Sequence, residues 1–447
     1  MESWQSLVQV CRRWRGLVFG SPRCLNLQLR CTIGKSARIS RISQDVWPAL
    51  PLLIEGIVNN KTSVDNVIAE LKHSDRIRHI YLYFYTTSQI EEIWTQMRVP
   101  FPELAFLSLS GRHLSMSFVP FQVLPDLLLG GSAPRLRFLR LDSIPFPGLP
   151  KLLLSTTHLV RLYLVNIPHS GYISPEVMAA CLSTLTSLEE LHFQFGYPQS
   201  SPDQESQRSS SPTRSVLPAL TKFLFKGEND YLEELVARID SPRLRELEAT
   251  FFNDIDFNTP ELIRFVSHSS TLKAPILAYI FFDSRTASVK LQMTIFEYFK
   301  VKILCREPGW QLSSLAQICT TSLPLLTTTE NIFIDESIIY SHFDWNHGIE
   351  NIEWLELLLP FTAVKNLYLS KQFASRIAPA LQEMTRGGTT EVLSTLQNLY
   401  LEGFLGSRSV QEGIKSFISA RQLTNHPVVI SDWDGSSCPS FLSGPSG

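Results

Sequence analysis

A six-residue pattern, apolar-x-x-apolar-x-apolar, recurs along most of this chain and limits its possible folds more than any other feature. Seven steps separate the first copy, at Ile77, from a weaker copy at Leu272, a mean period of about 28 residues. Individual steps range from 23 to 32 residues, so the repeats are irregular. The clear copies are Ile77–Leu82, Leu104–Leu109, Leu136–Leu141, Leu159–Leu164, Leu188–Phe193, Leu220–Phe225, Leu244–Ala249, Val364–Leu369 and Leu396–Leu401.

The spacing inside each copy predicts a short strand, because alternate residues of a strand share one face. One strand cannot bury that apolar face alone, so successive units must stack and share a core. Helix starts lie between the copies: Ser174-Pro175-Glu176 and Thr259-Pro260-Glu261 each place a cap residue, a first-turn proline and an acid in order. Residues 25–430 are therefore predicted to form an α/β fold, an irregular leucine-rich-repeat solenoid with a curved parallel sheet and outer helices.

Three stretches interrupt the repeats. Residues 197–215 are rich in serine and proline and are predicted to be a flexible insertion. Ser201 and Ser211 each precede a proline there, and whether they are phosphorylated is left open. Residues 278–305 contain short β-like runs and are predicted to form an irregular β insertion. Residues 431–447, rich in Ser, Gly and Pro, are predicted to be a disordered tail.

The overall charge excludes two classes of partner. The chain has 40 basic and 42 acidic side chains, a net charge of −2, so no global field attracts nucleic acid or an anionic membrane. The 7 cysteines include no Cys-x-x-Cys pair, which favours thiols in a reducing compartment. Arg12, Arg13 and Arg15 fall where the apolar part of a signal peptide would begin. An intracellular protein, cytoplasmic or nuclear, is the expectation.

The motifs of enzyme, cofactor and metal chemistry are missing. The sequence has no P-loop, no His-Glu-x-x-His and no Gly-x-Ser-x-Gly. Residues 254–265 imitate the start of a calcium loop but have Thr259 where glycine is needed and Phe265 where glutamate is needed. His342, Asp344 and His347 lie close in sequence without a fourth ligand. We therefore predict no catalytic residue, no bound metal and no cofactor: the chain is not expected to be an enzyme.

The residues between the apolar positions should face the exposed, concave side of the sheet, where solenoids usually bind partners. Aromatic and basic side chains gather there over the copies between residues 77 and 193. Aromatic and arginine side chains are enriched at binding hot spots, although strand surfaces favour aromatic residues in any case. An acidic or phosphorylated segment of a protein is the predicted partner, with Arg140 and Arg161 as charge-assisted donors. The candidate partner-binding residues are Tyr81, Tyr83, Arg140, Arg161, Tyr163 and His192.

The N-terminal residues resemble the last helix of an F-box, in which a Cys-basic-x-Trp run precedes the first repeat. The matching positions, within a segment at residues 1–24, are Val10, Cys11, Arg12, Trp14, Leu17 and Val18. Residues 45–51, 310–316, 354–361 and 420–423 resemble a group of fungal F-box proteins with irregular leucine-rich repeats. The Leu-Pro-x-Glu turn that opens an F-box has no counterpart after Met1, so the first half of the F-box is missing from this chain.

The resemblance implies a non-catalytic substrate-recognition subunit of a cullin-type (Skp-cullin-F-box) ubiquitin ligase. Its partners would then be a protein substrate and, if the F-box is complete in the full gene product, an Skp-type adaptor. A leucine-rich-repeat interaction scaffold without any link to ubiquitin is the alternative.

Overall fold

The computed structural model describes two compact units, Met1–Gly196 (unit 1) and Tyr197–Gly447 (unit 2). The residues that the structure describes are 11–13, 16, 28–33, 50–85, 90–111, 122–198, 214–252, 259–322, 324–336, 351–387, 392–402 and 408–433.

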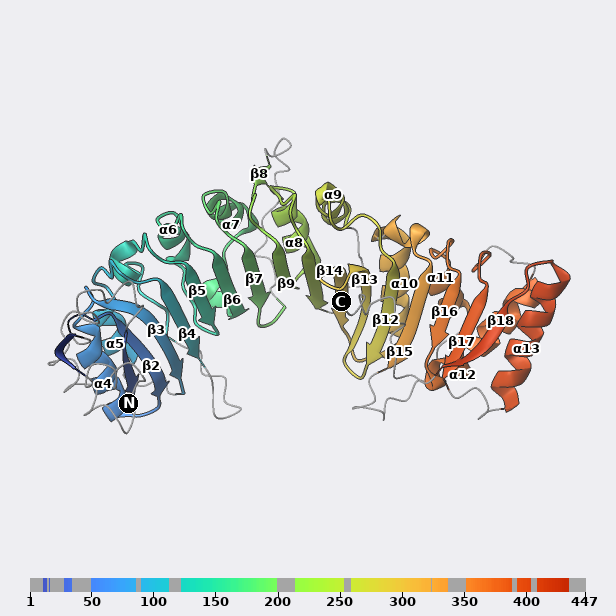
Figure 1. Ribbon diagram of the computed structural model, residues 1–447, viewed down its shortest axis with the longest axis horizontal. Coiled ribbons are helices and arrows are strands. Elements are labelled where there is room, and N and C mark those ends of the chain that lie inside the picture. The colour runs from blue at the N-terminus through green and yellow to red at the C-terminus, as the bar shows by residue number, and fades with distance from the viewer. Residues whose placement is uncertain are drawn as a thin grey trace. The chain divides into compact units, whose positions relative to one another are not determined.

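Unit 1 contains a parallel sheet whose strands follow the order of the sequence (Figure 1). Every neighbouring pair from β1 to β7 runs parallel. The apolar positions of the six-residue pattern lie in register: Leu107 pairs with Leu139, and Leu139 with Leu162, all fully buried. The strands are β1 (Leu29–Ile33), β2 (Leu52–Val58), β3 (Ile77–Phe84), β4 (Phe106–Gly111), β5 (Phe138–Asp142), β6 (Arg161–Ile167) and β7 (Glu190–Phe195).

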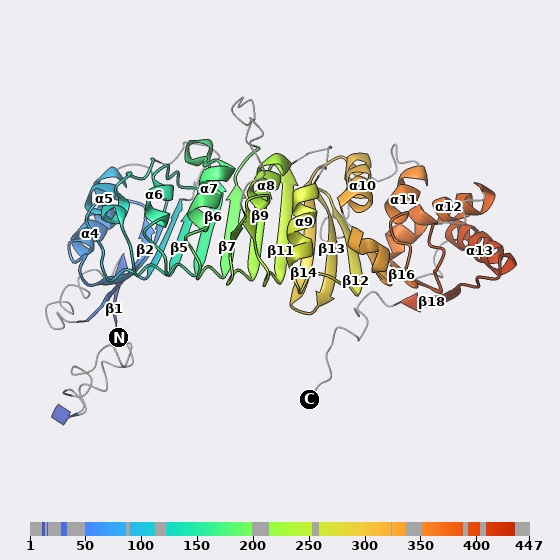
Figure 2. The same ribbon diagram turned by 90° about the horizontal axis from the view of Figure 1, so that it is seen from above.

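The helices of unit 1 lie along one face of its sheet (Figures 1 and 2). Asn60 and Ser63 form a capping box at the start of α4, and the Ser174 hydroxyl accepts a hydrogen bond from the Val177 N–H at the start of α7. Among the described residues of unit 1, no helix covers the opposite face, which we call the open face. The elements are α4 (Lys61–Leu71), α5 (Ile90–Gln96), η1 (Leu128–Gly131), α6 (Leu149–Leu153), η2 (His169–Gly171) and α7 (Pro175–Leu182).

Unit 2 also holds an open, mostly parallel sheet, with strands in the order β9, β11, β14, β13, β12, β15, β16, β17, β18. A separate short pair, β8 (Ser215–Val216) and β10 (Ile239–Asp240), runs parallel. The main strands are β9 (Lys222–Gly227), β11 (Glu246–Phe252), β12 (Leu277–Asp283), β13 (Thr286–Thr294), β14 (Glu297–Leu304), β15 (Asn331–Glu336), β16 (Asn366–Leu369), β17 (Asn398–Glu402) and β18 (Val429–Trp433).

Three consecutive strands, β12, β13 and β14, interrupt the repeat order in unit 2. β13 is antiparallel to both β12 and β14, while β14 is parallel to β11 and β12 is parallel to β15. Two reversals restore the original strand direction, so the meander fits between parallel neighbours without breaking the ladder. At the first reversal, the Asp283 carboxylate accepts hydrogen bonds from the Arg285 N–H at 2.7 Å and the Thr286 hydroxyl at 2.6 Å.

The helices of unit 2 follow its parallel strands, and the one that begins at Pro260 starts where Thr259-Pro260-Glu261 predicts. Thr259 precedes α9, and Pro260 is its first residue, although the Thr259 side chain makes no capping hydrogen bond. The elements are α8 (Asn229–Val236), α9 (Pro260–His268), α10 (Pro308–Gln317), η3 (Ile318–Ser322), η4 (Pro324–Thr328), α11 (Asn351–Leu358), α12 (Lys371–Gly387) and α13 (Arg408–Leu423). Together, the two units confirm a mixed α/β fold with open and mostly parallel sheets.

An aromatic stack departs from the sequence expectation that the positions between the apolar residues are exposed. Phe333 and Tyr368 are only 3% and 6% exposed. Their rings stack at a centroid distance of 4.0 Å, Tyr400 continues the stack at 4.3 Å, and Trp433 meets Phe333 edge-on at 5.6 Å. Rings in register on neighbouring strands shield one another, so these positions belong to a second core of unit 2.

Several sequence predictions fall outside the described residues. Val10, Trp14, Leu17 and Val18 of the F-box-like helix are among them, while Cys11 and Arg12 are described and exposed. Ser201, Ser211, the 254–258 stretch and the 342–347 histidines also lie outside, as do most of the 197–215 insertion and of the 431–447 tail. The start of that tail was predicted wrongly, because residues 431–433 pair with β17 as the end of β18.

Candidate interaction surface

The structure places all six predicted partner-binding residues on the open face of unit 1. Tyr81, Arg140, Tyr163 and His192 lie in one row across β3 to β7, in which Ser108 is the β4 member. Arg161 belongs to the adjacent row, with His79, Phe106, Phe138 and Glu190. Tyr83 stands two residues further along β3 than Tyr81, and the two tyrosine hydroxyls are hydrogen-bonded to each other.

Aromatic rings run almost without interruption across these rows, from β3 to β7. The chain of contacts, which we call the ring row, joins His79, Phe106, Phe138, Tyr163 and His192. Successive ring centroids are 5.8, 4.1, 5.2 and 3.9 Å apart. Neighbouring strands are spaced about 4.8 Å apart, so the ring row is about 20 Å long. It forms a half-buried, rigid aromatic surface.

The two arginines that the sequence marks as anion donors already have acidic partners within the sheet. Arg140 pairs with Asp142 at 2.9 Å, and Arg161 pairs with Glu190 at 3.0 Å. Asp142 is fixed further by Ser143 at 3.1 Å and Asn166 at 2.9 Å. This part of the open face therefore carries balanced charge, and an acidic partner would have to compete with Asp142 and Glu190.

Burial changes the titration of two members of the ring row. Burial, and then the hydrogen bond that the Tyr163 hydroxyl donates to Glu190, raises the pKa of Tyr163 to about 12. Burial lowers the pKa of His79, and Arg78 lowers it further. Both side chains are thus uncharged near neutral pH, which suits an aromatic contact surface.

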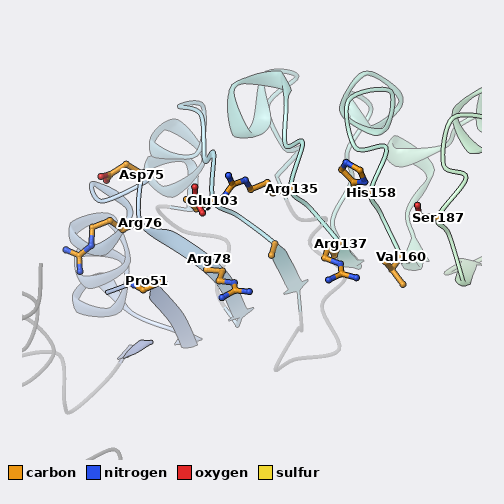
Figure 3. A pocket seen from close by; sticks show the side chains of 11 residues that line it. Pro51, Asp75, Arg76, Arg78, Glu103, Arg135, Arg137, His158, Val160 and Ser187 are labelled. Atoms are coloured by element: carbon orange, nitrogen blue, oxygen red, sulfur yellow. Dashed lines mark hydrogen bonds and ion pairs between the residues drawn. The ribbon is translucent and has the colours of Figure 1, made fainter. Parts of the chain in front are cut away.

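A groove of about 630 Å³ lies beside the ring row, where the strands of unit 1 begin (Figure 3). Residues from the starts of β2 to β7 line it, and they include four arginines and one histidine against two acids. Figure 3 shows Arg78 and Arg137 extending from the starts of β3 and β5. The lining residues are Pro51, Asp75, Arg76, Arg78, Glu103, Ala105, Arg135, Arg137, His158, Val160 and Ser187.

The groove arginines have different partners. The Arg76 guanidinium donates to the Leu50 carbonyl at 2.8 and 3.2 Å, and Arg135 is ion-paired with Glu103. Arg137 is exposed and has no ion-pair partner among the residues that the structure describes. The basic excess of unit 1 therefore lies in the groove rather than between the predicted Arg140 and Arg161.

Our sequence prediction missed the groove, although the sequence contains a signal for it. Arg-apolar-Arg occurs at Arg76-Ile77-Arg78 and again at Arg135-Leu136-Arg137, each centred on the first apolar position of a repeat copy. Ile77 begins β3 and Leu136 lies just before β5, so the arginines on either side of each reach the same edge of the sheet. The repeated Arg-apolar-Arg pattern is therefore the sequence signal for the basic groove.

Within the described part of the chain, there is no group of three or more His, Cys, Asp or Glu side chains that could hold a metal ion. Cys181, Cys305 and Cys319 are buried, and burial raises the pKa of each thiol. Among these same residues, no helix has both the length and the apolar character needed to span a membrane.

Comparison with known proteins leaves the family open. No family model matches the chain, and no curated protein matches it. The crystal structure of the leucine-rich repeat-containing protein LegL7 from Legionella pneumophila is similar over 88% of this chain and 97% of that chain, at 10% sequence identity and a TM-score of 0.28. The assignment of a repeat fold rests on the strand registers of the two units, not on this likeness.

Proposed function

We propose that the protein is a non-catalytic interaction protein that binds an extended segment of another protein across the open face of unit 1. The observation that carries this proposal is the ring row, five half-buried rings in contact across the strands from β3 to β7. Aromatic side chains bring large contact area at low cost in side-chain entropy, which is why they are enriched at binding hot spots.

The groove favours one orientation of the bound segment. Acidic side chains of the bound segment would point toward Arg78 and Arg137, because the basic side chains outnumber the acidic ones there. Tyr81 and Tyr83 would border the segment on β3. Arg140 and Arg161 would contribute only if the partner displaced Asp142 and Glu190 from them. Asp142 is buried, so leaving it without Arg140 would make such an exchange costly there, whereas the more exposed Arg161–Glu190 pair is easier to replace.

The double variant Phe106→Ser/Phe138→Ser tests the ring row. It removes the central stacked pair and should reduce recovery of the bound protein at least about tenfold, since two hot-spot rings together contribute about 2 kcal/mol or more. The measurement is quantitative affinity capture with the full chain, followed by titration of the purified captured protein.

Leu154→Ser/Val177→Ser is the matched control, because these apolar side chains are 56% and 43% exposed on the helical side of unit 1. The control should retain the captured protein. Equal recovery by both double variants would contradict binding at the ring row, provided that both melt like the unmodified protein.

A link to ubiquitin transfer is a second proposal, supported by the resemblance of Val10 to Val18 to the last helix of an F-box. In that role, the N-terminal segment would contact an Skp-type adaptor, and the repeats would hold the substrate. The product of the full gene should then co-purify with an Skp-type adaptor, and Trp14→Ala should abolish the association. Failure of the full product to bind the adaptor would favour the interaction scaffold without ubiquitin linkage.

A further inference from the structure

A second charged surface lies in unit 2, on four neighbouring strands. Lys226 of β9, Thr250 of β11, Lys302 of β14 and Ser288 of β13 are in register and form one row across the sheet, which we call the lysine row. The two lysines are half-buried, whereas Thr250 and Ser288 are only 8% and 5% exposed. The two short hydroxyl side chains are thus more buried than the two longer lysine side chains beside them.

Most of the charged side chains near this row have a partner of opposite charge. In the adjacent row, Lys300 pairs with Glu248 at 3.3 Å, and in the row beyond it Lys222 pairs with Glu246 at 2.7 Å. Tyr298 donates a hydrogen bond to Glu246 at 3.4 Å, and the Lys290 ammonium lies 4.6 Å from the centroid of the Tyr298 ring. On β9, β11, β13 and β14, five lysines and two glutamates therefore share this face, and Asp335 on β15 lies in the continuation of the lysine row beyond Phe281.

Lys226 and Lys302 are the uncompensated members. Neither has a carboxylate partner among the described residues, and the Lys226 ammonium instead lies 5.2 Å from the centroid of the Phe252 ring. Burial lowers the pKa of Lys226, and repulsion from Lys302 lowers it further. An anion placed between the two ammonium groups would relieve that repulsion. The lysine row therefore favours binding of a negatively charged ligand.

We propose that the lysine row of unit 2 binds the phosphate dianion of a phosphorylated serine or threonine in a partner protein. One strand separates β9 from β14, so the backbone positions of the two lysines are about 10 Å apart. Their long side chains can therefore approach one phosphate from opposite sides. The Thr250 hydroxyl lies between them and can donate to a third oxygen. Two positive charges, with the Thr250 hydroxyl between them, match the charge and the acceptor oxygens of a phosphate monoester, whereas Ser288 lies beyond Lys302.

The neighbouring acids favour a single compact anion over a polyanion. Glu246 and Glu248 lie on β11, between the paired lysines, where they would repel the continuous backbone charge of a nucleic acid. A carboxylate carries only one charge and would leave one of the two lysines uncompensated. This inference does not rest on binding at the ring row, because the two surfaces belong to different units.

The test uses the full chain and degenerate peptide libraries that differ only in a central residue: phosphoserine, serine or glutamate. Fluorescence anisotropy should give at least about tenfold tighter binding of the phosphoserine library than of the other two. Lys226→Gln/Lys302→Gln should remove most of this preference. Thr250→Val, which keeps the shape and the charges, should weaken phosphopeptide binding severalfold. Binding should also strengthen as pH rises through about 6, where the phosphate loses its second proton.

The matched control is Lys365→Gln/Lys371→Gln, which removes a lysine paired with Glu330 just before β16 and an exposed lysine at the start of α12, and should change binding less than about twofold. Phe106→Ser/Phe138→Ser should leave phosphopeptide binding intact, so failure at one surface is distinguishable from failure at the other. Equal binding of the three libraries, full binding by the double lysine variant, or Lys226-dependent binding of an oligo(dT) single strand as tight as that of the phosphopeptides would each overturn the proposal.

Discussion

Leu139→Asp should unfold unit 1. Leu139 is fully buried at the centre of β5, in register with Leu107 on one side and Leu162 on the other. A carboxylate there would be surrounded by aliphatic side chains, with no donor in reach. The expected loss in free energy of unfolding is at least about 4 kcal/mol, a large part of the stability of a typical domain. The loss should be smaller in acid, because burial raises the pKa of the new carboxyl group and protonation favours the folded state.

Circular dichroism and thermal melting of the full chain measure this effect. Phe138→Asp is the matched control: it introduces the same carboxylate one residue earlier, on the half-exposed face of the same strand. We expect the control to lose less than half as much stability, because its carboxylate stays in contact with water. Unchanged melting of Leu139→Asp would mean that the alternate positions of the repeat are assigned to the wrong faces of the sheet.

Phe333→Ala should destabilise unit 2 by about 3–5 kcal/mol, the usual cost of removing a buried aromatic ring. Phe333 is 3% exposed and contacts Tyr368, Tyr279 and Trp433, so its loss leaves a cavity in the middle of the aromatic stack. Its neighbours also lose the ring-to-ring contacts that position them. The effect should be confined to unit 2, which limited proteolysis can distinguish from loss of unit 1.

Two control variants distinguish the loss of ring-to-ring contacts from the loss of side-chain volume. Phe333→Leu keeps most of the volume and should cost less than Phe333→Ala. Tyr400→Ala, at the partly buried end of the stack, should also cost less. If all three variants lost the same stability, or if none lost any, the aromatic stack would not be a core of unit 2.

The repeat pattern predicts much of the fold, because it is a local property. Apolar side chains at fixed positions in each copy place Leu139 and Leu162 on the buried face, and Ser174-Pro175 predicts where α7 begins. The same alternation places Tyr81, Arg140, Tyr163 and His192 together in one row of the open face. Strand periodicity and helix capping depend on residues only a few positions apart, so they can be predicted from the sequence alone.

The tertiary structure decides which exposed side chains meet, because those contacts join residues that lie one repeat apart. Arg161 meets Glu190 and Arg135 meets Glu103 only when neighbouring strands adopt a particular register. The copies of the pattern align these residues at equivalent positions, but only the folded side chains decide which of them pair. Tyr368 has the same local pattern as Tyr163, and both have a ring on each side, yet Trp433 packs edge-on against Tyr368, which is only 6% exposed. The sequence by itself determined which face of each strand is apolar. Packing between strands decided where charge is left uncompensated, in the groove of unit 1 and the lysine row of unit 2, because the charge of a surface depends on which neighbours neutralise it.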